Sequence, residues 1–185
     1  MRRADPHAGP EAATWEWCEA MLPSVSRTFA LCIRYLPEDL RQGVTLSYLL
    51  CRVADTVEDA VMLTPQRKGE LLGLYGSALD DPDGDLSPFA TALPGRDDAD
   101  AVLTGRAAEI MALFHAQPLA VREAVAPWVA DMCRGMAEFS GRKPEVIATT
   151  PPRTWRGLHT EHELERYCYY VAGTGGHLLT ALFAA

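Results

Sequence analysis

The segment from Glu38 to about Met62 constrains the fold most, because it has the apolar spacing of one long helix. Pro37 stands just before it, and Glu38 and Asp39 lie in its first turn, where the helix dipole favours carboxylates. Apolar side chains face most directions around this helix, so other elements have to cover it. We therefore expect a packed helical bundle built around this segment.

The rest of the sequence divides into helical lengths at prolines and glycines, and no strand-type alternation between turns is found. The chain is therefore predicted to be all-α. Its 185 residues suit one domain, with residues 1–13 a loose leader and 14–185 the helical domain. The other predicted helices are Thr14–Met21, ended by Pro23, then Ser24–Tyr35, Gln66–Leu79, Ala101–Ala116, Leu119–Phe139, interrupted or kinked at Pro127, and Glu161 to the last residue.

Two connecting segments separate these helices. Asp80–Asp100 contains three prolines, two glycines and seven aspartates, and it lacks the closing glutamate of an EF-hand. We predict a solvated acidic loop there, because such residues cannot build a core. Ser140–Pro152 is predicted to be a second connector.

Composition narrows the partners and the compartment. The formal charge of −8 has the wrong sign for a general phosphate-backbone binder, so no nucleic-acid partner is expected. Neither a signal peptide nor an apolar run long enough for a bilayer span is present in the sequence. The five cysteines form no Cys-x-x-Cys pair, which predicts reduced core residues in a cytoplasmic protein.

A polar stripe runs along the central helix. At 100° per residue, Tyr48, Arg52, Asp55 and Asp59 fall within about 60° of the helix circumference. The sequence thus sorts its polar groups onto one side of the helix. The opposite side is apolar and consists of Leu50, Val53, Ala54, Val57 and Val61.

The stripe has the residue types of a metal and phosphate site. Asp55 and Asp59 lie one turn apart with Glu58 beside them, so their oxygens can reach one hard cation. An exposed helix face on which Arg52 neutralises Asp55 is the alternative. The surrounding apolar residues favour an internal cavity instead. Because Mg²⁺ completes its shell with phosphates, the pattern predicts a ligand with a phosphorylated head and an apolar body, such as a prenyl diphosphate.

Several blocks of the sequence resemble the squalene and phytoene synthase family in order and spacing. They are Ser26–Phe29, Leu36–Arg41, Tyr48–Asp59, Met132–Phe139 and Tyr167–Gly176. The resemblance covers residues 15–185. It implies the all-α isoprenoid (terpenoid) synthase bundle and a head-to-head condensation of two prenyl diphosphates through a cyclopropyl intermediate.

The resemblance also implies roles for the charged residues. Asp55, Glu58 and Asp59 match the family's first Mg²⁺-binding acidic motif. The implied substrate is a prenyl diphosphate, with farnesyl diphosphate favoured and reduction by NADPH to squalene. The positions implied to contact the diphosphate are Ser26, Arg27, Tyr48 and Arg52.

Other matched positions concern the prenyl chain and the reacting carbons. Phe29, Val171 and Gly175 would line the prenyl pocket, and Tyr167 matches a tyrosine near the reacting carbons. Gly173 and its neighbouring glycines fit close passage of a chain or helix, with plain packing as the alternative. The catalytic residues so implied are Tyr167, Tyr48 and Arg52, and the positions associated with NADPH in squalene synthases are Arg27 and Arg52.

The sequence departs from the family in one respect, because no Asp or Glu follows Tyr167 and the family's second aspartate motif is missing. Asp131 and Glu138 on the middle helix do not replace it, nor does Asp100 in the acidic loop. We therefore expect a partial chain that lacks the later helices, or one that needs a second chain for that motif. The alternative functions are a phytoene or dehydrosqualene type of synthase and a non-catalytic prenyl-diphosphate-binding subunit. Peripheral membrane contact is a further expectation, because substrate and product are lipids.

Overall fold

The computed structural model describes residues 10–142, 145–147, 153–155 and 157–185. Within these ranges the regular structure is helical apart from one short antiparallel strand pair, so the predicted all-α class is confirmed. The elements are α1 (Pro10–Val25), α2 (Arg27–Ile33), α3 (Glu38–Asp59), α4 (Pro65–Ala78), the 3₁₀ helix η1 (Ser87–Thr91), α5 (Ala99–Gly105), α6 (Ala107–His115), α7 (Leu119–Ser140), β1 (Glu145–Ile147), β2 (Arg153–Trp155), α8 (Glu161–Cys168), the π-helical turn η2 (Tyr169–Gly173) and α9 (Thr174–Ala184).

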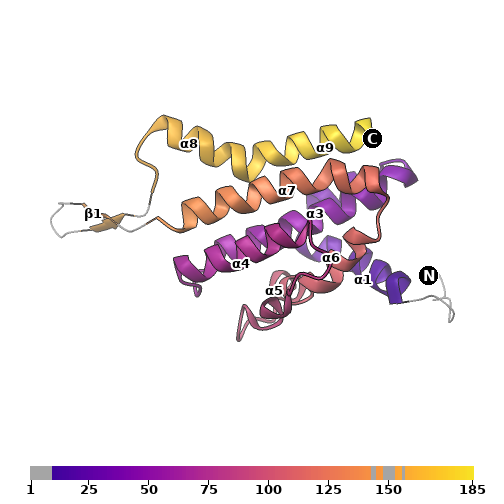
Figure 1. The fold of residues 1–185 in the computed structure, drawn as a ribbon, viewed down its shortest axis with the longest axis horizontal. Helices are drawn as coiled ribbons and strands as arrows, with labels where there is room; N and C mark the ends of the chain where they lie inside the picture. Colours follow the sequence, from indigo (N-terminus) through magenta and orange to yellow (C-terminus); the bar gives the residue numbers. More distant parts are fainter. Residues whose placement is uncertain (1–9, 143–144, 148–152, 156) are drawn as a thin grey trace.

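The long helices lie lengthwise beside one another (Figure 1). α7 packs along α4, α9 and α3, while α5 and α6 contact α3 and the N-terminal helix α1. The core fills the space between them. Its largest fully buried side chains include Leu46, Leu49, Leu50 and Val53 of α3, Leu71, Leu72 and Tyr75 of α4, Ile110 and Phe114 of α6, and Met136 of α7.

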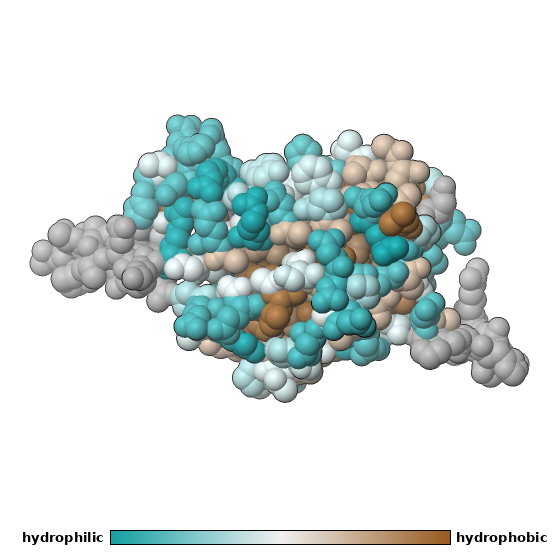
Figure 2. All heavy atoms as spheres, in the orientation of Figure 1, coloured by the Kyte–Doolittle hydropathy of each residue, from teal (hydrophilic) through white to brown (hydrophobic). Residues whose placement is uncertain are grey.

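The surface is polar over much of one side. On the face shown in Figure 2, hydrophilic side chains cover most of the molecule and hydrophobic ones show between them. In the described part of the chain, no helix combines the length and the apolar character needed to cross a membrane.

α3 begins at Glu38, as predicted, and ends at Asp59 rather than near Met62. Ala60 leaves helical geometry with ψ 99°, which stops the helix. Val61 was predicted to lie on the apolar side of the helix; it lies outside the helix instead and is 96% exposed. The apolar side of α3 is therefore made by the residues before Ala60.

The first helix is longer than predicted. α1 runs from Pro10 to Val25, so residues 10–13 of the predicted leader are helical and residues 1–9 lie outside the described residues. Pro23 lies inside α1 instead of ending it. A proline removes the hydrogen bond that its own nitrogen would donate, and here only two residues of helix follow it.

The acidic segment 80–100 is not simply a solvated loop. Four of its apolar side chains join the core, Leu86, Phe89, Ala92 and Leu93. Asp98 caps α5 by accepting a hydrogen bond from the Ala101 N–H, and Asp100 lies in the first turn of that helix. The sequence interpretation missed this because aspartates dominate the segment and hide its apolar positions.

The predicted helix Ala101–Ala116 is two helices. α5 ends at Gly105, and Arg106, with φ −105° and ψ 21°, separates it from α6. Glycine is a poor helix former, which makes this a natural break. The guanidinium of Arg106 lies 3.9 Å from the ring centroid of Trp17 and pairs with Glu109, so the break also ties α6 to α1.

The last predicted helix is interrupted by a π-helical turn. η2 lies between α8 and α9 and places Tyr170 against α7. The connector before α8 contains the antiparallel pair β1–β2, with Val146 opposite Thr154, where no strand was predicted. Three residues per strand are too few for a visible alternation.

The five cysteines form no disulfide. Cys18 and Cys133 are buried and Cys51 is partly buried, but Cys32 and Cys168 are exposed. The prediction that all five belong to the core is therefore wrong for two of them. Both lie on helix sides that nothing in the described residues covers.

Candidate functional site

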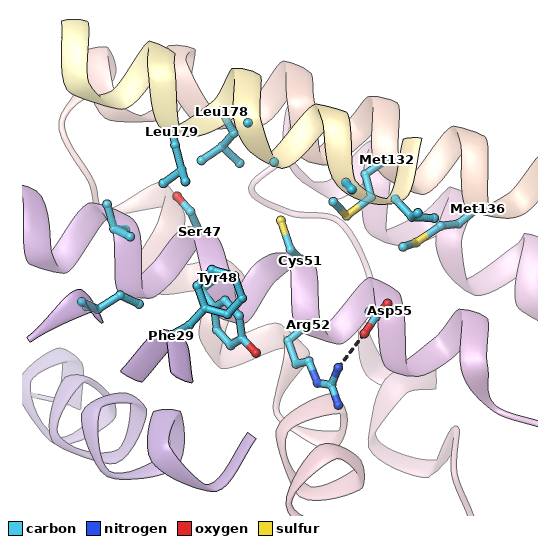
Figure 3. A pocket seen from close by; sticks show the side chains of 16 residues that line it. Phe29, Ser47, Tyr48, Cys51, Arg52, Asp55, Met132, Met136, Leu178 and Leu179 are labelled. Carbon is cyan, nitrogen blue, oxygen red and sulfur yellow. Dashed lines mark hydrogen bonds and ion pairs between the residues drawn. The ribbon is translucent and has the colours of Figure 1, made fainter. Parts of the chain in front are cut away.

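A pocket of about 440 Å³ lies between α3 and the helices packed over its polar stripe (Figure 3). We call it the α3 pocket. Figure 3 shows Leu178 and Leu179 toward one end of it and Arg52 with Asp55 toward the other. The pocket is therefore apolar over most of its length and charged at one end. Its lining residues are Phe29, Ile33, Val44, Ser47, Tyr48, Cys51, Arg52, Asp55, Met132, Met136, Val171, Ala172, Gly175, Gly176, Leu178 and Leu179.

Six of the predicted site residues line this pocket. They come from three parts of the chain that the fold brings together, namely α2, α3 and the continuous segment η2–α9. The residues are Phe29 on α2, Tyr48, Arg52 and Asp55 on α3, Val171 in η2 and Gly175 on α9. The remaining predicted residues, Ser26, Arg27, Glu58, Asp59 and Tyr167, are not among those that line it.

The charged end of the α3 pocket is an ion-pair network around Arg52. Its Nη1 donates to Asp55 Oδ2 at 2.6 Å, while its Nε and Nη2 donate to the two carboxylate oxygens of Asp100, each at 2.9 Å. The hydrogen bond to Asp100 is the main reason why the pKa of Arg52 is raised, so this guanidinium stays charged. The sequence pattern places Asp100 in an acidic loop, whereas in the structure it belongs to this network, 48 residues away from Arg52.

The carboxylates at this end are only partly solvated. Burial raises the pKa of Asp55, and the neighbouring Asp59 adds to that rise, while Arg52 opposes it. Burial and Asp59 likewise raise the pKa of Glu58. An added cation would offset both effects, because it stabilises the ionised carboxylates.

The acidic residues fit a partial metal site. Among the residues that the structure describes, no group of three or more His, Cys, Asp or Glu side chains is arranged to hold a metal ion by itself. Asp55 and Asp59 nevertheless stand one turn apart on α3, with Asp59 exposed. Mg²⁺ is commonly bound by one or two carboxylates and completes its shell with water and phosphate oxygens, so this donor set fits it.

The residues at the start of α2 have structural tasks. The Ser26 Oγ accepts a hydrogen bond from the Phe29 N–H at 3.1 Å and so caps the helix. Arg27 is exposed and makes no ion pair within the described ranges. The Tyr48 hydroxyl donates to the Val25 carbonyl at 3.3 Å, and its ring centroid lies 5.3 Å from that of Phe29. These contacts hold Phe29 and Tyr48 at the wall of the α3 pocket.

Tyr167 faces a second pocket, of about 540 Å³, that Glu58 also lines. The Tyr167 hydroxyl donates to Glu58 Oε1 at 3.3 Å, and burial together with Glu58 raises the pKa of this tyrosine to about 12. Lys68 and Arg142 lie in the same wall, and the Lys68 ammonium donates to the Glu58 carbonyl. Tyr167 and Glu58 are thus brought together, but not into the pocket that holds Arg52 and Asp55.

Sequence reasoning missed much of the apolar lining. Met132 and Met136 lie one turn apart on α7, and Leu178 and Leu179 come from α9. An apolar helix face gives no sign of whether it meets a core or a pocket. The thiol of Cys51 also lines the pocket, and burial raises its pKa to about 12, so it is protonated at neutral pH.

The glycines of the last helix are open rather than tightly packed. A Cβ on Gly175 or Gly176 would meet nothing within 4 Å. Close passage occurs instead at Gly135 of α7, where an added Cβ would overlap Cβ and the ring of Tyr170. The close approach of helices expected at Gly173 and its neighbours is therefore not found at Gly175 or Gly176, and a Cβ on Gly173 would come nearest to the Tyr169 ring, at 3.2 Å, one turn earlier in the chain. A close approach of helices depends on Gly135 instead.

The comparisons with known proteins agree with one another. Residues 22–185 match the family described as squalene/phytoene synthase. A squalene synthase from Eremothecium gossypii is 30% identical over 165 residues, which is 89% of this chain and 34% of that protein. Squalene synthase 1 from Arabidopsis thaliana is 28% identical over 185 residues, 100% of this chain and 40% of that protein.

A solved structure shares the fold. TcSQS in complex with the ligand BPH1237 superimposes with a TM-score of 0.72 at 27% identity, over 91% of this chain and 44% of that chain. The isoprenoid synthase bundle expected from the resemblance is thereby confirmed. The chain spans between 34% and 40% of the length of the two curated relatives named above.

Proposed function

The chain belongs to the squalene/phytoene synthase family, and from that premise we propose that its α3 pocket binds a prenyl diphosphate for head-to-head condensation. One observation carries the proposal. A single pocket joins an apolar length lined by α7 and α9 to a charged end formed by Arg52 and Asp55 on the polar stripe of α3. A prenyl diphosphate has the same two halves, an apolar tail and an anionic head.

The charged end would hold the diphosphate. We propose that Asp55 and Asp59, with Glu58 beside them, bind Mg²⁺, which supplies positive charge to the departing diphosphate. Arg52 would donate to the phosphate oxygens from the same side. Donors fixed before the reaction stabilise the charge that develops as the carbon–oxygen bond breaks.

The apolar length would hold the tail and protect the carbocation. The Phe29 and Tyr48 rings pack together at the wall of the pocket, where an aromatic face favours a nearby cation. Met132 and Leu178 line the same space, so a bound tail is shielded from water, which would otherwise trap the cation. Tyr167 donates to Glu58 in the second pocket, and we propose that it assists proton removal or stabilises the cation where the reacting carbons reach that side of α3.

The diphosphate contacts proposed for the start of α2 require some rearrangement. The Ser26 Oγ is occupied as an acceptor by the Phe29 N–H, but its own hydroxyl hydrogen is free to be donated to a phosphate. Arg27, in the next position, is exposed and makes no ion pair within the described ranges, so its guanidinium is available to an anion. Both are therefore proposed as outer contacts of the head group, after Arg52.

We propose farnesyl diphosphate as the substrate and squalene as the product, with NADPH as the reductant. The identities of about 30% to squalene synthases support this choice over phytoene. The described residues show no site shaped for NADPH, because Arg27 stands exposed without an ion pair and Arg52 is the residue proposed for the diphosphate.

Calorimetric titration of the chain with a non-hydrolysable farnesyl diphosphate analogue tests the binding proposal. Binding is expected with Mg²⁺ and to be much weaker without it, because the carboxylates repel an anion until a cation joins them. Equal binding with and without Mg²⁺ would contradict the metal assignment. Incubation with farnesyl diphosphate, Mg²⁺ and NADPH then separates two functions: product formation supports the condensing enzyme, and binding without product supports a binding subunit.

Gly175 offers a test of where the tail lies. Gly175→Leu is expected to weaken binding of the farnesyl analogue about tenfold while affecting a geranyl analogue less, because the new side chain would fill the pocket. Gly175→Ala is the control, and it should bind normally and unfold at a slightly higher temperature, since alanine favours helix. Equal losses for both analogues would place the tail elsewhere.

A further inference from the structure

The unusual feature of the charged end is that one guanidinium is shared by two carboxylates from different helices. The two carboxylate oxygens of Asp100 accept hydrogen bonds from Nε and Nη2 of Arg52, at 2.9 Å each, and Asp55 accepts one from Nη1. Bidentate hydrogen bonding of this kind fixes the plane of a guanidinium, whereas a single contact does not. Asp100 lines neither of the two pockets described above.

The two carboxylates stand in different relations to the α3 pocket. Asp55 lines it, one turn from Asp59 and beside Glu58, so an incoming cation would compete with Arg52 for the Asp55 oxygens. Asp100 lies on α5, and its side chain is 27% exposed, so a large part of it is covered. The contact to Asp100 can therefore persist when Asp55 changes its partner.

We propose that Asp100 is a positioning residue that holds Arg52 at the charged end of the pocket while Asp55 passes from Arg52 to a cation. This inference rests on the proposed function. Once Asp55 binds the cation, Nη1 of Arg52 is released and its two hydrogens face the phosphate. Without Asp100, a released Arg52 would have no partner on its other edge and would lose its orientation.

The charges of the site agree with this role. Asp55, Glu58 and Asp59 supply three negative charges on one helix, and among the described ion pairs Arg52 contacts one of them, Asp55. Arg52 would be drawn onto Asp55 and away from an incoming anion if nothing opposed that attraction. Asp100 supplies the opposing pull from α5, on the far edge of the guanidinium.

A first experiment needs no ligand. The Arg52 Nε–H, identified in ¹⁵N NMR spectra by its loss in Arg52→Lys, is expected to exchange slowly with solvent because it donates to Asp100. Asp100→Asn should speed this exchange about tenfold, since the two carboxylate oxygens that accept from Arg52 are replaced by a single amide oxygen. Asp97→Asn is the matched control, because it removes the same charge from an exposed residue of the same segment.

The second experiment measures the coupling between Asp100 and Arg52 in binding of the farnesyl analogue. With Mg²⁺ and the farnesyl analogue, Asp100→Asn should raise Kd about tenfold, Asp100→Glu should restore part of the affinity, and Asp97→Asn should change nothing. In an Arg52→Lys background, Asp100→Asn should have no further effect, because Asp100 acts only through Arg52. Additive losses in the two backgrounds would overturn the proposal and leave Asp100 as a structural tie between α3 and α5.

The other possible outcomes distinguish the positioning role of Asp100 from the proposed function. If the wild-type chain binds no analogue, the proposed function fails, but an Nε–H that speeds up in Asp100→Asn still supports the hold on Arg52. Unchanged exchange in Asp100→Asn overturns it. If Asp100→Asn does not fold, the test is made on the wild-type chain. Exchange of its Arg52 Nε–H with solvent should stay slow after Mg²⁺ and the analogue are added, and fast exchange in the bound state would refute the inference.

Discussion

Asp55→Ala is expected to lower Mg²⁺-dependent affinity for the farnesyl analogue by at least about a hundredfold. Changes to outer-shell partners already cost about 10- to 100-fold in metal affinity, and Asp55 is proposed as a direct ligand. It is also the acidic residue of the stripe that lines the α3 pocket. In any form of the enzyme that turns over, the same change is expected to abolish product formation.

The same variant should not be less stable by much. Burial raises the pKa of Asp55, so its ionised form at neutral pH is disfavoured in the folded chain, and alanine removes that cost along with the ion pair to Arg52. An unfolding temperature close to that of the wild type would confirm that the loss is functional. Asp80→Ala, on an exposed residue, is the control that should bind normally. Near-normal binding by Asp55→Ala would remove the metal assignment.

Gly135→Ala is expected to cost about 3 kcal/mol of unfolding free energy, at the upper end of what overpacking usually costs. The added Cβ would overlap Cβ and the first ring atoms of Tyr170, which lie next to the backbone and cannot swing aside. α7 and η2 would have to separate. For a chain of this size such a loss lowers the unfolding temperature by about 10 °C.

Thermal unfolding of Gly135→Ala beside Gly73→Ala measures this effect. Gly73 lies within α4, and a Cβ there meets nothing within 4 Å, so the same substitution should stabilise the chain by up to about 1 kcal/mol. A Gly135 variant as stable as the wild type would show that α7 and η2 do not approach so closely. Binding of the farnesyl analogue should weaken in parallel, because Met132 and Met136 flank Gly135 in the wall of the α3 pocket.

The local pattern of the sequence predicted much of the fold because helix period and breakers act over short distances. The starts of α3 at Glu38 and of α7 at Leu119 follow from such signals. Errors occurred where a local signal competed with packing. Pro23 did not end α1, and the aspartates of segment 80–100 concealed side chains such as Phe89 that join the core.

Part of the candidate site could be predicted because it lies on a single helix. Tyr48, Arg52 and Asp55 share one side of a single helix, so helix geometry alone brings them together. Glu58 belongs to the same motif but faces the second pocket with Tyr167. At 100° per residue Glu58 lies about 60° outside the stripe, so periodicity separates it from Arg52. Which pocket it faces depends on which helices pack on that side of α3.

The sequence by itself determined the helical class, the polar stripe of α3 and, through its matching blocks, the family. The tertiary structure alone decided that Asp100 holds Arg52, that Gly135 lets α7 meet Tyr170, and that Tyr167 opens onto a different pocket from Asp55. The physical reason is distance along the chain. Helix propensity and amphipathic spacing are set by neighbours within a few residues. The contacts that only the tertiary structure shows join residues much farther apart: 48 positions for Arg52 and Asp100, 35 for Gly135 and Tyr170, and 109 for Glu58 and Tyr167.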